Sequence, residues 1–324
     1  MSPDHPLEGK VVLLTGGTGS FGGAFLQKAL READCVVRVF SRDEYKQSEL
    51  RERHGEERVR YMVGDIRDRE RLTRAARGAD VIVHAAAMKQ VPACEYNPFE
   101  AVQTNVIGAE NVVSAAIDAG VPRVVALSTD KAVNPINLYG ATKLCAEKII
   151  VQGNTYAVGE STRLCCVRYG NVVASRGSVV PLFERQREAG ELSITDERMT
   201  RFWITLEQAV ENVLYAVEHT RGGEVFVPRI PSMRVVDLAE AIAPGVDRRV
   251  IGIRAGEKLH EILVTSDEAR HTVVRDHVFT VLPEHHGWIQ DGLPSGEPLE
   301  EGFSFSSDTN DRFLDVEELR ALVS

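Results

Sequence analysis

The stretch VVLLTGGTGSFGG, residues 11–23, decides the fold of this chain of 324 residues. Its first five residues form an apolar run typical of a buried strand, and a helical pattern begins at Phe21. Between them, Gly16, Gly19 and Gly22 follow the TGxxGxxG form of the dinucleotide-binding fingerprint. Glycine at these positions permits a tight turn, close approach of a pyrophosphate, and close packing of helix on strand. The N-terminus of the helix attracts the anion, so the stretch predicts a dinucleotide site.

The same rhythm of strand and helix continues through the first 130 residues. Continuous Val, Ile and Leu runs, rather than alternating ones, are typical of parallel strands covered on both faces. Further strands of this kind are predicted at residues 36–40, 59–63, 81–84 and 123–127. We therefore expect an α/β fold, a doubly wound parallel Rossmann sheet with a smaller α/β substrate-binding lobe.

From about Asn171 the alternation of strand and helix becomes less regular, and the polar stretch 271–301 has no clear pattern. The elements expected in this half are two helices and a strand, at residues 206–218, 235–243 and 224–227. The expected domain boundaries are 8–170 plus about 203–231 for the dinucleotide-binding domain, and 171–202 plus 232–324 for the lobe.

Composition narrows the class of protein. The formal net charge is −10 and no basic stripe interrupts it, which argues against nucleic acid and anionic membranes as partners. The five cysteines follow no metal-ligand spacing, a pattern that suits the reducing cytoplasm. The start, MSPDHPLEGK, has no basic region leading into a long apolar run, so we do not expect it to be a signal peptide. No run of about 18 apolar residues predicts a membrane span. We expect a cytoplasmic protein without a metal ion.

The end of the second strand indicates which dinucleotide is bound. An acidic residue there usually binds the ribose 2′-hydroxyl of NAD. Here the strand ends in Ser41 and Arg42, with Lys46 close behind, and these side chains suit a 2′-phosphate. Asp43 leaves the alternative of a hydroxyl open. We favour NADP.

Candidate catalytic residues follow the fifth strand. Tyr139 and Lys143 are four residues apart, so they share one face of a helix. An ammonium at that distance lowers the pKa of a phenol, which then accepts a proton from an alcohol as hydride leaves its carbon. Asp130 and Lys131, next to the Thr129 hydroxyl, add an acid and base pair beside the expected nicotinamide site.

The predicted cofactor contacts lie on the glycine loop and on the ends of the strands. They are Gly16, Thr18, Gly19, Ser20, Phe21, Gly22, Ser41, Arg42, Lys46, Asp65, Ile66, Ala86, Lys89, Asn105, Leu127, Ser128, Tyr139, Lys143 and Val172.

With these residues in view, the chain resembles the inverting UDP-N-acetylglucosamine 4,6-dehydratases of the extended short-chain dehydrogenase/reductase superfamily, soluble enzymes that begin pseudaminic acid synthesis. The likeness runs from about Gly9 to the C-terminus and is poor at residues 268–303. It is carried by segments such as GDIRD, HAAAMKQVP, ALSTDKAVNPINLYGATKL, RYGNVVASRGSVVP, ITDERMTRFWI and IGIRAGEKLHE.

The resemblance implies a mechanism. Tyr139, assisted by Lys143 and Thr129, would deprotonate the sugar 4-hydroxyl while hydride passes from C4 to NADP. Lys131 would then remove the C5 proton, and Asp130 would protonate the 6-hydroxyl as water leaves. Hydride return to C6 and reprotonation of C5 on the opposite face would complete the inversion. As a base Lys131 must be neutral, for which we expect a partly desolvated pocket beside other cations.

The resemblance also implies substrate contacts and an oligomer. The expected contacts are Lys89, Asn171, Val180, Thr195, Arg254 and Glu257, with Arg198 and Arg201 as further phosphate partners. Gln90 stands where the family commonly has His, and Ala255 where it has Pro. Both departures lie at the pocket rim, so the substrate's identity stays open. Open alternatives are a related C5 epimerase or reductase on the same scaffold, and a non-catalytic NADP sensor. By analogy we expect a homo-oligomer.

Overall fold

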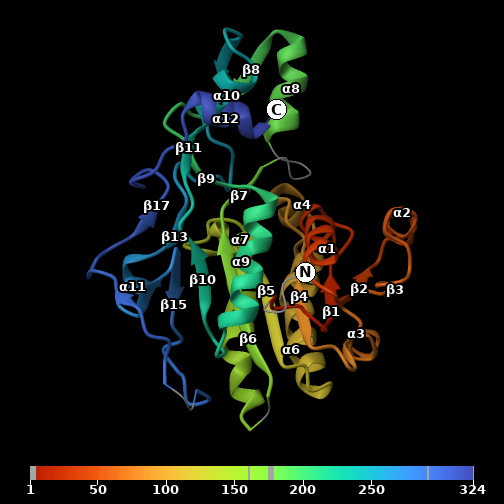
Figure 1. Ribbon diagram of the computed structural model, residues 1–324. Coiled ribbons are helices and arrows are strands. Elements are labelled where there is room, and N and C mark those ends of the chain that lie inside the picture. The colour runs from red at the N-terminus through yellow and green to blue at the C-terminus, as the bar shows by residue number, and fades with distance from the viewer. Residues whose placement is uncertain (1–4, 160, 174–178, 290–291, 324) are drawn as a thin grey trace.

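The computed structural model describes residues 5–323 except 160, 174–178 and 290–291. These residues form a central sheet of ten strands in the order β16-β14-β15-β10-β6-β5-β4-β1-β2-β3 (Figure 1). Seven neighbouring strands run parallel: β3 (Val59–Val63), β2 (Val36–Ser41), β1 (Val11–Thr15), β4 (Val81–His84), β5 (Arg123–Thr129), β6 (Arg163–Tyr169) and β10 (Val225–Pro228). The order from β3 to β6 is that of a Rossmann fold, so the predicted parallel sheet is confirmed.

Helices cover both faces of the sheet. β5 and β6 contact both α7 (Leu138–Gly153) and α9 (Leu206–His219). α9 packs on α1 (Ser20–Glu32), whereas α7 packs on α6 (Gly108–Asp118), which packs on α3 (Arg69–Ala76). The three central residues of β1 have no exposed surface, which is why this strand is apolar throughout.

Shorter helical elements connect these layers. They are α2 (Glu44–His54), α4 (Val91–Tyr96), α5 (Pro98–Val102), the π-helical η1 (Gln103–Ile107), and the 3₁₀ turns η2 (Asp130–Ala132) and η3 (Asn154–Ala157). No helix within the described residues combines the length and apolarity needed to cross a membrane.

A smaller lobe with its own apolar core lies beyond the carboxyl ends of the parallel strands (Figure 1). Its strands form two small sheets: β11 (Ser232–Arg234) with β9 (Thr200–Ile204) and β7 (Asn171–Val172), and β12 (Asp247–Val250) with β8 (Glu191–Ile194). Its helices are α8 (Val179–Ala189), α10 (Val235–Ile242) and α12 (Val316–Val323). A further strand pair, β13 (Ile262–Val264) with β17 (Phe305–Ser306), lies near α11 (Ser266–Ala269).

Residues 272–275, 278–281 and 297–298 extend the central sheet, although we expected them in the lobe. β15 (Val278–Val281) pairs antiparallel with β10, β14 (Thr272–Arg275) pairs with β15, and β16 (Glu297–Pro298) pairs with β14. Without the hairpin formed by β14 and β15, β10 would expose a row of unpaired backbone groups at the sheet edge. This segment therefore shares a sheet with the dinucleotide-binding domain.

A buried ion network fixes α7 against the sheet. Arg168 of β6 lies 2.5 Å from Glu147 of α7 and 2.9 Å from Glu268 of α11. Glu147 also accepts a hydrogen bond of 2.6 Å from the hydroxyl of Ser128, near the end of β5. The network therefore joins α7, the helix that carries Tyr139, to α11 through Arg168 of β6.

Candidate active site

A cavity of about 870 Å³ opens at the carboxyl ends of the parallel strands, where open α/β sheets bind ligands. Its walls come from the loops after β1 to β5 and from α7, and the lobe side contributes Trp203 and Glu257. Both of these side chains have a buried polar atom without a hydrogen-bond partner, Trp203 Nε1 and Glu257 Oε2. Polar ligand groups are expected there, because unpaired buried polar atoms are costly.

The glycine loop has the geometry that a pyrophosphate requires. Gly16 has a φ of +69°, and a Cβ there would lie 2.8 Å from the backbone nitrogen of Ala86. No side chain caps the start of α1, whose first turn lines the cavity. The positive end of the α1 dipole therefore faces the cavity, where it favours an anion. The loop fits a dinucleotide.

Gly22 and Gly23 of α1 provide a matched test of this packing. A Cβ at Gly22 would lie 2.5 Å from the Cα of Gly17, whereas one at Gly23 would meet nothing within 4 Å. We expect Gly22→Ala to lower the free energy of unfolding by about 1–3 kcal/mol and to weaken dinucleotide binding. Gly23→Ala should raise it by about 0.5–1 kcal/mol. Urea unfolding measures both, and equal effects at the two positions would contradict the close approach.

The end of β2 presents one loosely held cation to the cavity. Arg42 is largely exposed, and its Nη1 lies 3.8 Å from Asp65 Oδ2. Asp43, the alternative partner of a ribose hydroxyl, instead caps α2 by accepting from the Lys46 amide at 3.0 Å. Its carboxylate also pairs with the Lys46 ammonium at 2.6 Å. Of the two cations near the end of β2, Arg42 is thus more available for a cofactor phosphate than Lys46, which is paired with Asp43.

Tyr139 and Lys143 project from the first turns of α7 into the cavity, as the spacing predicts. Burial raises the pKa of Tyr139 to about 12, although the charge of Lys131 and a hydrogen bond with Thr129 act in the opposite direction. The Lys143 ammonium donates to the Leu127 carbonyl at 2.6 Å, and burial lowers its pKa. The phenol therefore contacts the Thr129 hydroxyl at the end of β5, and the amine contacts the same strand at Leu127.

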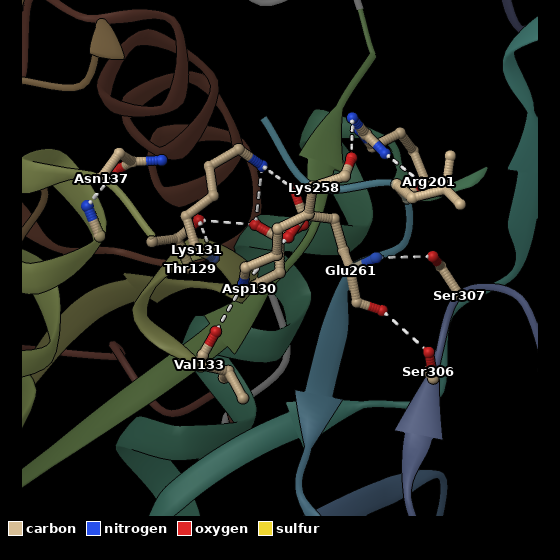
Figure 2. A network of polar contacts seen from close by, with 12 residues as sticks. Thr129, Asp130, Lys131, Val133, Asn137, Arg201, Lys258, Glu261, Ser306 and Ser307 are labelled. Atoms are coloured by element: carbon tan, nitrogen blue, oxygen red, sulfur yellow. Dashed lines mark hydrogen bonds and ion pairs between the residues drawn. The ribbon is translucent and has the colours of Figure 1, made fainter. Parts of the chain in front are cut away.

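Lys131 lies between two carboxylates, as Figure 2 shows. Its ammonium nitrogen is 3.0 Å from Asp130 Oδ1 and 3.5 Å from Glu261 Oε1. Burial alone would lower the pKa of Lys131, but these carboxylates outweigh burial and Arg201, so the pKa is raised. The expectation of a pocket of cations around a neutral Lys131 is therefore wrong, because the dominant neighbours are anions.

Asp130 is wholly buried and does not line the cavity. Its Oδ1 accepts from the Thr129 hydroxyl at 2.8 Å and from the Lys131 ammonium at 3.0 Å, and its Oδ2 has no partner. Thr129 and Lys131 do line the cavity. The Thr129 hydroxyl and the Lys131 ammonium therefore connect Asp130 to the cavity.

Glu261 was not predicted as a site residue, and Arg201, which holds the chain beside it, was predicted in another role. Arg201 is buried and donates to the backbone carbonyls of Thr200, Leu259 and Lys258, at 2.6, 3.1 and 3.0 Å (Figure 2). These bonds fix the backbone before Glu261. Arg201 was expected to bind a phosphate, but its guanidinium is engaged with the chain itself.

The structure gathers most of the predicted site residues around the cavity, but not all. The predicted cofactor residues line it with the exception of Asn105, whose buried amide bonds to the Met88 backbone and to Thr142. Of the predicted substrate residues, Lys89, Asn171 and Glu257 line it. The others do not: Val180 is buried in α8, Thr195 contacts Met199, Arg198 is exposed and paired with Asp196, and Arg254 is paired with Glu257. Among the described residues, no three His, Cys, Asp or Glu side chains come together as metal ligands would.

Comparison with known sequences identifies relatives over the whole chain. The sequence model of a family described as "Polysaccharide biosynthesis protein" matches residues 12–283. A UDP-N-acetylglucosamine 4,6-dehydratase (inverting) from Campylobacter jejuni is 46% identical, with 98% of each chain covered. A UDP-glucose 4-epimerase from Rickettsia akari is 47% identical over 80% of this chain and 79% of its own.

Solved structures share the fold. Pen from Bacillus thuringiensis is 39% identical, with a TM-score of 0.88 and 98% of each chain covered. DesIV, a dTDP-glucose 4,6-dehydratase from Streptomyces venezuelae solved with NAD bound, is 25% identical with a TM-score of 0.67, covering 77% of this chain and 86% of its own. Structural neighbours of this chain thus bind nicotinamide dinucleotides.

Proposed function

Because the chain belongs to the polysaccharide biosynthesis protein family, we propose that it is an NADP-dependent, C5-inverting UDP-N-acetylglucosamine 4,6-dehydratase. The product would be UDP-2-acetamido-2,6-dideoxy-L-arabino-hexos-4-ulose. The observation that carries this proposal is that Tyr139, Lys143 and Lys131 face the same cavity as the glycine loop. The Campylobacter jejuni dehydratase, similar over 98% of both chains, supports the substrate. We propose that the enzyme works in the cytoplasm as a homo-oligomer.

Tyr139 acts first on the sugar. Bound NADP supplies the chemistry of taking hydride from C4 and returning it to C6. Tyr139 receives the proton of the 4-hydroxyl, and the Lys131 cation together with the Thr129 hydroxyl stabilises its phenolate. Lys143, one turn further along α7, faces the same cavity. The resulting 4-keto group acidifies the C5 proton, which prepares the sugar for elimination.

Elimination depends on Lys131 and Asp130. Lys131 removes the C5 proton as the amine that remains when its own proton passes to Asp130 along their hydrogen bond. Asp130 supplies the proton with which the 6-hydroxyl leaves as water. Since Asp130 is buried behind the cavity wall, that proton passes through the Thr129 hydroxyl, 2.8 Å away. Protonation of C5 on the opposite face then gives the L-configured sugar.

The choice of NADP over NAD depends on Arg42. We expect Arg42→Ala to raise the Kd for NADP by about 10- to 100-fold, the loss of one charge-assisted hydrogen bond, with little change for NAD. Calorimetric titration of both dinucleotides measures the effect. Asp43→Asn is the control, because Asp43 caps α2 and pairs with Lys46. Parallel losses for NADP and NAD in the Arg42 variant would contradict the assignment.

Incubation with UDP-N-acetylglucosamine and NADP, followed by NMR of the product, tests the proposal. Dehydration is identified by a methyl doublet from C6 and inversion by the proton couplings of C5. A retained hydroxymethyl group with an inverted C4 would instead identify a 4-epimerase, the activity of the Rickettsia akari relative. Recovery of unchanged sugar, with dinucleotide bound, would favour a sensor.

A further inference from the structure

The charged groups around Lys131 form a row that continues beyond its two carboxylates. Glu261 is almost wholly buried and bridges two lysines, with Oε1 3.5 Å from Lys131 and Oε2 3.5 Å from Lys258. The Lys258 ammonium also donates to the Val133 carbonyl at 2.5 Å, directly after the η2 turn that holds Asp130 and Lys131 (Figure 2). Negative and positive groups therefore alternate from Asp130 to Lys258.

We infer that Glu261 and Lys258 form a charge pair that decides whether the proton shared by Asp130 and Lys131 rests on the carboxylate or on the amine. Both are positioning residues, because they act through Lys131. The catalytic meaning of the inference rests on the proposed function.

The proton balance explains why such a pair is needed. An ammonium with a carboxylate and an amine with a carboxylic acid contain the same number of protons. One transfer along the 3.0 Å hydrogen bond from Lys131 Nζ to Asp130 Oδ1 converts the first form into the second. The amine then takes the C5 proton, the acid releases its proton toward the departing 6-hydroxyl, and the C6–O bond breaks. Lys131 and Asp130 end as ammonium and carboxylate, the state in which they began.

The surroundings of Lys131 define the two opposing influences. Asp130 on η2 and Glu261, just before β13, favour the ammonium, and the pKa of Lys131 is raised accordingly. Arg201 on β9 opposes it, Tyr139 on α7 interacts with its charge, and Asn171 on β7 adds a neutral oxygen at 3.4 Å. Apart from Lys131 itself, Lys258 is the cation that pairs with Glu261 among the described residues. It weakens the hold of that carboxylate on the ammonium.

Opposite charge deletions test the inference. Glu261→Gln removes the anion, so Lys131 should lose its proton at lower pH, whereas Lys258→Met should have the reverse effect. In the substrate-free protein, we measure the labelling of Lys131 by acetic anhydride at a fixed alkaline pH, with mass spectrometry as readout. We expect labelling about tenfold faster in Glu261→Gln, since one pKa unit is a tenfold change in free amine, and about threefold slower in Lys258→Met.

Turnover provides a second readout. Both limbs of the pH profile of dehydration should move to lower pH in Glu261→Gln and to higher pH in Lys258→Met, by about one unit and half a unit. Lys258→Arg keeps the charge and should keep the wild-type profile, and the double variant should return toward it. Glu240→Gln, which removes a carboxylate from an exposed ion pair with Arg248, controls for net charge.

The outcomes separate the inference from the proposed function. A faster labelling of Lys131 in Glu261→Gln and a slower one in Lys258→Met support the charge pair, whether or not UDP-N-acetylglucosamine is converted. If the sugar is not converted, the proposed function is contradicted and the charge pair is not. Dehydration by wild-type protein, with labelling and pH limbs unmoved in both folded variants, overturns the inference and leaves the function standing. Thermal unfolding of each variant establishes that it is folded.

Discussion

Replacing Tyr139 with phenylalanine is expected to lower the turnover of UDP-N-acetylglucosamine by about a thousandfold, within the usual range for loss of a general base. Only the hydroxyl is removed, so the ring remains in its buried place on α7. The Kd of the dinucleotide should change little, because Lys143 and the glycine loop are untouched. Steady-state kinetics and calorimetric titration measure the two effects, and turnover at the wild-type rate would remove Tyr139 from the mechanism.

The pH dependence provides a further check on this tyrosine. Burial raises the pKa of Tyr139 to about 12 in the ligand-free chain, so its phenolate fraction increases as the pH rises toward that value. Thr129→Val removes a hydrogen bond that lowers this pKa. The rate of C4 oxidation in that variant should therefore reach its maximum at higher pH than in the wild type. A limb shifted to lower pH would contradict the hydrogen bond's role.

Replacement of Lys131 is expected to separate oxidation from elimination. Lys131→Ala and Lys131→Arg should both lose water elimination by about a thousandfold or more, since neither provides a neutral amine at ordinary pH. Oxidation at C4 should persist in both. The product trapped by NMR should be a 4-keto sugar with its 6-hydroxyl retained.

The arginine variant is the matched control for packing. An arginine keeps a cation between Asp130 and Glu261, whereas alanine leaves the two buried carboxylates without it. We expect alanine alone to lower the free energy of unfolding substantially, because removing one partner of a buried ion pair is costly. Normal dehydration by Lys131→Arg would place the C5 base elsewhere.

Local sequence was sufficient for most strands of the parallel sheet. The apolar runs that became β1, β3 and β4 match the observed strands residue for residue. For β1 and β4 the reason is that their neighbours on both faces are other apolar groups. β6 was not predicted, although it lies in the centre of the sheet. Its sequence, RLCCVRY, contains Arg168, which is buried only because Glu147 and Glu268 reach it from distant parts of the chain.

The candidate site was predictable where a motif fixes geometry through a single turn or helix. The glycine loop and the pair Tyr139 and Lys143 are of this kind. Glu261 could not be predicted in this way, because the segment KLHE has the sequence pattern of an ordinary polar loop. Its position beside Lys131 depends on Arg201, which binds the backbone carbonyls of that segment. The charge state of Lys131 likewise follows from a carboxylate 130 residues away in sequence.

Arg168 couples the stability of the two halves of the chain. Its guanidinium is almost wholly buried, so loss of both carboxylates would leave an unpaired charge in the core at a cost of about 3–5 kcal/mol. Detachment of the segment that contains Glu268 would therefore also loosen α7 and the phenol it carries. The chain should consequently melt as one cooperative unit, and no partially unfolded form is expected to keep a working catalytic helix.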